Sequence, residues 1–271
     1  MKTLANHIIL YDEECPMCLA YTKAFTKLNM LPKNGRESYQ KIPDYICPLI
    51  DKQRAVNEIA LVDTETGEVT YGIDSVFKIL GNAISFLKPL FNFAPFHWLT
   101  TKAYAFISYN RKVIIPADVK AHTIQPDFKI QYRIAYLILT WFVTAYILTS
   151  YAHLLTDFVP LGNKYREYLI CGGQIFFQAI IIGFYKKEKL WDYLGNMMTI
   201  SMAGALLLIV PLFLARWMEI ISIFYILYFL MVAGLMLLEH LRRSRILKIS
   251  LLMSITWILY RLIVLGLIFS L

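Results

Sequence analysis

Long uncharged runs dominate the second half of the chain. From residue 134 onward, four runs contain no Asp, Glu, Lys or Arg, and they cover residues 134–156, 168–185, 193–215 and 220–238. A fifth run, 249–271, is interrupted only by Arg261. A helix needs about 20 residues to cross the hydrocarbon core of a bilayer. The pattern therefore predicts an all-α transmembrane bundle of about five spans over residues 133–271.

The first half has shorter apolar segments separated by turns. Residues 7–11 read as a buried strand, and residues 19–31 as a helix that ends before Pro32. Two apolar stretches, 59–62 and 68–71, flank the polar loop 63–67 and predict a β-hairpin. A helix follows over 76–80, with Asp74 or Ser75 as its N-cap. This order of elements predicts a small α/β domain over residues 1–115.

The remaining segments of the first half give weaker signals. Residues 37–45 suit a weak strand, residues 47–50 begin a short helical stretch, and residues 87–110 suit a helix pair interrupted at Pro95. Residues 116–132, with Pro116 and Pro126, are expected to link the two domains. The start of the chain has one Lys and a short apolar run that ends in three acidic residues, so no secretory signal peptide is expected there.

Charge changes the picture in two ways. The net charge is +8, but residues 1–132 carry 15 basic and 13 acidic residues, whereas residues 133–271 carry 12 and 6. The excess lies among apolar runs, which favours a lipid bilayer over nucleic acid as the partner. Nine basic residues fall on one side of the spans and three on the other; they are Lys129, Arg133, Lys186, Lys187, Lys189, Arg242, Arg243, Arg245 and Lys248 against Lys164, Arg166 and Arg216. This asymmetry predicts a cytoplasmic N-terminal domain and an outer C-terminus, as in a bacterial inner membrane protein.

The candidate chemistry lies at Cys15-Pro16-Met17-Cys18, between the predicted strand and helix. Free N–H groups and the helix dipole favour a thiolate at Cys15, and Pro16 suits the first helical position. Cys18 lies on the same helix face, so the two sulfurs can close a disulfide. Two cysteines packed at a helix start, or half a zinc site, are the alternatives. Zinc needs two further ligands, whereas Cys47 stands alone and neither His97 nor His122 has a paired spacing.

Residues 11–18, Tyr-Asp-Glu-Glu-Cys-Pro-Met-Cys, resemble the signature of the DCC family of thiol-disulfide oxidoreductases. Segments 58–63, 69–76 and 104–112 resemble later segments of that family in the same order, so the likeness covers residues 6–115. It implies a thioredoxin-like fold in which the Cys15/Cys18 pair cycles between dithiol and disulfide. Two departures stand out. Glu13 replaces the usual Gly, and Ala55-Val56-Asn57 precedes the third strand where a thioredoxin has a proline.

These features together predict a membrane-anchored thiol-disulfide oxidoreductase that faces the cytoplasm and acts on a protein or small thiol/disulfide substrate. Cys15 is the expected nucleophile and Cys18 the resolving thiol, while Asp12 is the candidate proton acceptor or positioning group. In the reducing cytosol such a pair is transient and catalytic rather than a structural crosslink. No motif predicts a bound cofactor. The alternative is a non-enzymatic transporter or redox-sensor subunit whose cytoplasmic domain binds a partner.

Three further observations concern the spans. An enzyme that passes electrons from outer disulfides to quinone needs an outer cysteine pair, but the loops 156–167 and 216–219 have no cysteine, and Cys171 is alone in the second span. Arg261 is expected to pair with Glu219 or a lipid phosphate, or to extend to the membrane surface. Gly162, Gly172, Gly173 and Gly183 are expected to permit close approach of helices.

Overall fold

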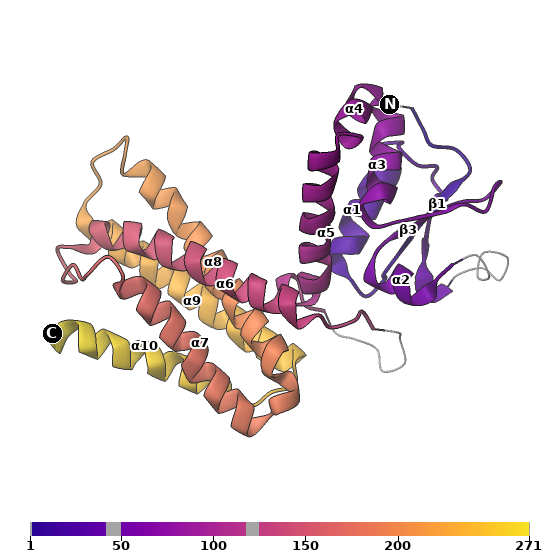
Figure 1. The fold of residues 1–271 in the computed structure, drawn as a ribbon. Coiled ribbons are helices and arrows are strands. Elements are labelled where there is room, and N and C mark those ends of the chain that lie inside the picture. Colours follow the sequence, from indigo (N-terminus) through magenta and orange to yellow (C-terminus); the bar gives the residue numbers. More distant parts are fainter. Residues whose placement is uncertain (1, 42–49, 118–124, 271) are drawn as a thin grey trace. The chain divides into compact units, whose positions relative to one another are not determined.

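A computed structural model describes residues 2–41, 50–117 and 125–270 of the chain (Figure 1). The chain divides into two compact units, Met1–Tyr132 (unit 1) and Arg133–Leu271 (unit 2). Unit 1 contains a small sheet with helices, and unit 2 is helical. Each unit is described separately below.

The sheet of unit 1 has four strands in the order β2-β1-β3-β4. The strands are β1 (His7–Tyr11), β2 (Arg36–Ser38), β3 (Ala60–Asp63) and β4 (Val69–Tyr71). β1 runs parallel to β2 and antiparallel to β3, which pairs antiparallel with β4. The expected hairpin is confirmed, because Val62 lies opposite Val69 and Gly67 takes the positive φ that ends its loop.

Helices cover both faces of this sheet. They are α1 (Pro16–Lys27), α2 (Lys52–Asn57), α3 (Gly72–Ala83), α4 (Lys88–Phe91) and α5 (Ala94–Ile114), with short 3₁₀ turns at Tyr39–Lys41 and Ser85–Leu87. Ile9 and Leu61 point to the face packed by α1, α3 and α5, whereas Leu10 and Ala60 point to the face packed by α2. Successive strand residues alternate between faces, so the continuous apolar runs in β1 and β3 correspond to strands buried on both sides.

The start of α3 differs from the prediction. The helix begins at Gly72, which has a φ of 62°, and its N-cap is Tyr71 without a side-chain cap. Ser75 Oγ donates to the carbonyl of Thr70 at 2.7 Å, and Asp74 Oδ1 lies 2.7 Å from the His97 ring. The N-cap prediction was wrong because Gly72 turns the chain into the helix directly after β4. The helical stretch predicted to begin at Cys47 falls on residues 47–49, outside the described residues, and on Ile50.

Unit 2 contains the five helices long and apolar enough to cross a membrane that the uncharged runs predict. They are α6 (Ile130–Ala152), α7 (Arg166–Tyr185), α8 (Leu190–Leu214), α9 (Ser222–Ile246) and α10 (Leu252–Ser270), with 3₁₀ turns at His153–Leu155 and Lys187–Lys189. α6 begins within the last residues of the segment predicted as a linker. These helices make the chain an integral membrane protein.

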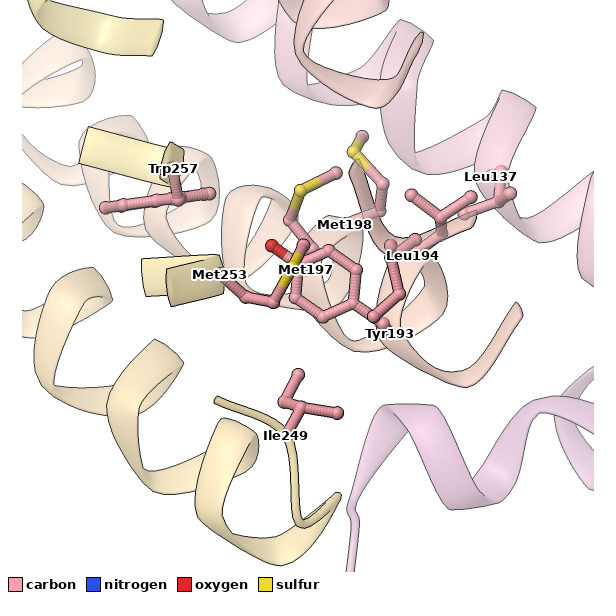
Figure 2. Packing of buried hydrophobic residues seen from close by; sticks show 9 residues of the cluster. Leu137, Tyr193, Leu194, Met197, Met198, Ile249, Met253 and Trp257 are labelled. Atoms are coloured by element: carbon pink, nitrogen blue, oxygen red, sulfur yellow. The ribbon is translucent and has the colours of Figure 1, made fainter. Parts of the chain in front are cut away.

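The core of unit 2 is built around α8. In the most apolar 18-residue stretch of the span that contains α8, 50% is buried inside the protein. The corresponding share is 11% for α9 and 17% for α10. Figure 2 shows Tyr193, Met197 and Met198 of this helix together with Met253 and Trp257 of α10. Within this core the Tyr193 hydroxyl donates to Gln178 Oε1 at 2.9 Å. Pairing of this kind is needed where no water satisfies polar groups.

Two of the four glycines expected at helix contacts lie there. A Cβ on Gly172 would lie 2.4 Å from the Trp141 ring of α6, and one on Gly173 would lie 2.3 Å from the Tyr260 hydroxyl of α10. The expectation was wrong for the other two. The three atoms nearest to a Cβ on Gly162 all belong to Arg166, four positions along the chain, and a Cβ on Gly183 meets nothing within 4 Å.

One end of unit 2 gathers basic side chains from several helices. Arg133 at the start of α6 donates to the carbonyl of Trp191 in α8. Arg243 near the end of α9 donates to Asn196 Oδ1 at 3.0 Å, and Lys186 after α7 donates to the carbonyl of Lys248 at 3.0 Å. The larger of the two basic groups in the sequence therefore has members that meet at one end of the bundle.

Candidate active site: the Cys15/Cys18 pair and Arg111

The junction between β1 and α1 positions the cysteine pair. Cys15 is the N-cap of α1, and its extended backbone (φ −98°, ψ 106°) directs Sγ to accept the backbone N–H of Cys18 at 3.3 Å. Pro16 occupies the first turn, where its missing N–H leaves no donor unpaired. Cys15 is 7% exposed and Cys18 is 3% exposed. The predicted order of strand, turn and helix is thus confirmed, and it places both thiols at the helix start.

Asp12 builds the turn that precedes Cys15. Its backbone carbonyl accepts the Cys15 N–H at 3.2 Å, and its Oδ1 accepts the Glu14 N–H at 3.0 Å. Gln40 Nε2 donates to the same Oδ1 at 2.9 Å. Glu13 is not among the residues with positive φ, and its carboxylate pairs with Lys41 at 2.9 Å. The turn therefore forms without the glycine of the DCC signature, because the Asp12 side chain and carbonyl hold it.

Arg111, near the C-terminal end of α5, contacts the turn that Asp12 forms. Its Nη2 donates to Asp12 Oδ2 at 3.2 Å and to the carbonyl of Val56 at 2.6 Å, and its Nη1 donates to the carbonyl of Asn57 at 3.3 Å. The Arg111 side chain is 5% exposed and that of Asp12 is 7% exposed. Val56 and Asn57 belong to the segment before β3 where the sequence lacks a thioredoxin-type proline. In this chain their carbonyls bind the guanidinium.

The surroundings shift the pKa values of the two thiols in opposite directions. The pKa of Cys15 is lowered from 9.0 to about 7, chiefly because its sulfur accepts a hydrogen bond from the Cys18 thiol. The Cys18 backbone N–H and the charge of Arg111 act in the same direction, while burial and the Asp12 carboxylate oppose them. The pKa of Cys18 is raised well above its ordinary value by the hydrogen bond to Cys15 and by burial. A thiolate therefore forms at Cys15 before it forms at Cys18.

Two pockets of different character flank the pair. Cys15 lines a polar pocket with Asp12, Glu14, Arg111 and Lys112. Cys18 lines an apolar pocket of about 750 Å³, counting its open side, between α1, α3 and α5. Its other walls are Met17, Tyr21, Phe25, Ile73, Val76, Tyr104, Ile107, Ser108 and Arg111. Arg111 lies in the wall between the two pockets.

The structure brings together all three residues that the sequence singled out. Asp12 contacts backbone, Gln40 and Arg111, which are the contacts of a positioning group; its role as a proton acceptor stays a prediction. Arg111 was missed as a site residue, although it lay inside the segment 104–112 that carried the family resemblance. Arg111 lies three residues after Ser108 and seven after Tyr104, so it is on the same, buried face of α5. A lone basic residue on a buried face indicates a buried partner.

Among the residues that the structure describes, no group of three or more His, Cys, Asp and Glu side chains is placed to hold a metal ion. Cys47 and His122, which were weighed as zinc ligands, lie outside those residues. In comparisons with family models, curated proteins and solved structures, nothing matches this chain. The chemistry of the Cys15/Cys18 pair is therefore derived from its own geometry.

Proposed function

We propose that unit 1 is a thioredoxin-like thiol-disulfide oxidoreductase of the DCC type, anchored by unit 2 to a membrane and facing the cytoplasm. The observation that carries the proposal is the asymmetry of the two sulfurs. Cys15 at the helix start has a pKa lowered to about 7, whereas the pKa of Cys18 one turn later is raised. An attacking thiolate and a protonated resolving thiol are the two species that exchange requires.

The reaction follows from this asymmetry. The Cys15 thiolate attacks one sulfur of a substrate disulfide, the substrate S–S bond breaks, and the other substrate sulfur leaves as a thiolate that takes up a proton. The Cys18 thiol then loses its proton and attacks Cys15 Sγ in the mixed disulfide, which releases the second substrate thiol. Two electrons pass from the dithiol to the substrate, and a dithiol or low-molecular-weight thiol of the cytosol reduces the Cys15–Cys18 disulfide for the next cycle.

The two pockets suggest how a substrate docks. The apolar pocket beside Cys18 suits an apolar side chain next to the substrate disulfide, and the exposed Lys112 beside Cys15 suits an acidic neighbour. A protein or peptide disulfide with an apolar residue adjacent to one cysteine is the favoured substrate class.

The cytoplasmic orientation rests on the basic side chains at one end of unit 2. Lys and Arg concentrate in cytoplasmic loops, and members of the larger basic group meet through Arg133, Arg243 and Lys186. An odd number of spans then carries the C-terminus to the opposite side. The cytosol keeps thiols reduced, which favours a catalytic use of the Cys15/Cys18 pair.

Trapping of the mixed disulfide tests the proposal. The full-length protein in detergent micelles is incubated with an oxidised peptide and analysed by mass spectrometry as wild type, Cys15→Ser and Cys18→Ser. Cys18→Ser should retain the peptide on Cys15 as a stable adduct, because its resolving thiol is missing. Cys15→Ser should carry no peptide on Cys18, because that thiol stays protonated. Cys171→Ser is the matched control, and it should turn over like wild type.

The outcomes separate the alternatives. Adducts on Cys18 in Cys15→Ser together with none on Cys15 in Cys18→Ser would reverse the assigned roles. Oxidation of wild type to a stable disulfide without turnover of the peptide would favour the redox-sensor alternative. No exchange by wild type and no labelling of either variant would refute the oxidoreductase proposal.

A further inference from the structure

A cavity in the interior of unit 2 is lined by residues from all five spans. Its empty space, counting its open side, is about 660 Å³. Most of the wall is apolar, with residues such as Leu148, Phe229 and Val232. A mostly apolar wall with a few polar groups is typical of sites for small molecules. Met198, labelled in Figure 2, lies at the boundary between the cavity and the core of unit 2.

Three polar side chains in the cavity wall have buried atoms without a hydrogen-bond partner. They are the hydroxyl of Thr144 in α6, the side-chain NH₂ of Gln174 in α7 and the Nε of Arg261 in α10. Thr144 is 3% exposed and Gln174 is 5% exposed. A buried donor without an acceptor is unfavourable in a protein interior and more so in hydrocarbon. Three such groups from three helices in one cavity indicate that a ligand satisfies them.

The positive charge of Arg261 indicates that the ligand is negatively charged. The residue is the midpoint of α10, about 14 Å from either helix end at 1.5 Å per residue. Its guanidinium stacks on the Trp257 ring, with Cζ 4.0 Å from the ring centre. Within residues 133–270, neither Glu219 nor any other carboxylate lies within ion-pair distance of Arg261, and none lines the cavity. A cation without a counter-ion in the middle of a membrane span calls for an anion.

We propose that the cavity binds a fatty acid, with the carboxylate held by Arg261, Gln174 and Thr144 and the acyl chain along the apolar wall. A carboxylate carries one negative charge against the single cation, and its two oxygens accept up to four hydrogen bonds. A phosphate monoester carries more charge than one Arg neutralises, and a quinone is neutral and leaves the guanidinium uncompensated. The inference concerns unit 2 alone and does not depend on the chemistry of the Cys15/Cys18 pair.

Binding is measured by thermal unfolding of the full-length protein in detergent, followed by tryptophan fluorescence, with sodium oleate as the probe. Oleate should raise the melting temperature in a saturable way, because a ligand that binds only the folded state stabilises it. Oleyl alcohol, which has the same chain without the charge, and acetate, which has the charge without the chain, should each leave the melting temperature unchanged.

Three variants locate the site. Arg261→Gln should weaken oleate binding about tenfold to a hundredfold, as expected for a lost charge-assisted hydrogen bond. Thr144→Val should weaken it about twofold to tenfold while the ligand-free protein melts at the same or a higher temperature, because the deleted hydroxyl has no partner there. Thr149→Val is the matched control on α6, because its hydroxyl donates to the Ala145 carbonyl of its own helix, and it should bind oleate like wild type.

Several results would overturn the proposal. Equal stabilisation by oleyl alcohol, or equal oleate affinity in wild type, Arg261→Gln and Thr144→Val, would show that the carboxylate is not bound at this site. A saturable shift with a short-chain quinone and none with oleate would assign the cavity to a neutral ligand. If Arg261→Gln fails to fold, Thr144→Val against Thr149→Val decides the question alone.

Discussion

Arg111 and Asp12 form an ion pair at 3.2 Å although 99 positions separate them in the chain. Both side chains are buried, and the same guanidinium also binds the carbonyls of Val56 and Asn57. Removing one partner of a buried pair costs about 3–5 kcal/mol because the other charge stays uncompensated. The ion pair thus ties α5 to the turn that carries Cys15.

Arg111→Met should therefore lower the free energy of unfolding of unit 1 by about 3–5 kcal/mol. The measurement is hydrogen-exchange mass spectrometry on peptides from β1 and β3 in the full-length protein. Asp12→Asn combined with Arg111→Met should recover part of the loss, because no buried charge then remains unpaired. Lys112→Met, a neighbouring change at an exposed position, is the control and should have a small effect. Equal protection in wild type and Arg111→Met would contradict the structural role of the pair.

The lowered pKa of Cys15 predicts the pH dependence of its reactivity. Only the thiolate reacts with iodoacetamide, so alkylation of Cys15 should rise with pH through a midpoint of about 7 and level off above it. Arg111→Met should move this midpoint upward toward 9.0, because the positive charge that favours the thiolate is gone. Mass spectrometry of the Cys15 peptide over a pH series gives both midpoints. A wild-type midpoint near 9, or one that Arg111→Met lowers, would disprove the electrostatic account.

Two glycines of α7 provide a paired test of helix packing. Gly172→Ala should destabilise unit 2, because the new Cβ would meet the rigid Trp141 ring at 2.4 Å. Gly183→Ala should be neutral or slightly stabilising, because nothing lies within 4 Å and Ala favours a helix over Gly by up to about 1 kcal/mol. Thermal unfolding in detergent compares them. The packing account fails if both variants melt at the same temperature.

Membrane orientation gives a prediction that is independent of the site. A reporter active only outside the cytoplasm should work after Leu271 and fail before Met1, while a cytoplasmic reporter should show the opposite. Fusion after Lys189, between α7 and α8, should behave like the N-terminal fusion because two spans separate them. Finding both chain ends on one side would mean an even number of spans and remove the orientation argument.

The sequence predicted features that depend on neighbouring residues. The spans follow from uncharged run length, and the position of Cys15 at a helix start follows from an apolar strand and Pro16. Features that depend on distant contacts were not predicted. The acceptors of Arg111 come from segments about 55 and 99 positions away, and no local pattern reports them. Gly172 and Gly183 look alike in the sequence, because only the packing of α6 against α7 distinguishes them.

The position of Arg111 near the end of α5 has a consequence for the order of synthesis. The cysteine pair leaves the ribosome long before Arg111, and at about 5–20 residues per second the delay is roughly 5 to 20 s. During this interval the nascent thiols lack the ion pair that holds their turn. The ion pair can form only as α6, the first span, is about to emerge, so completion of the Cys15/Cys18 turn and delivery of the chain to the bilayer fall in the same short window of translation.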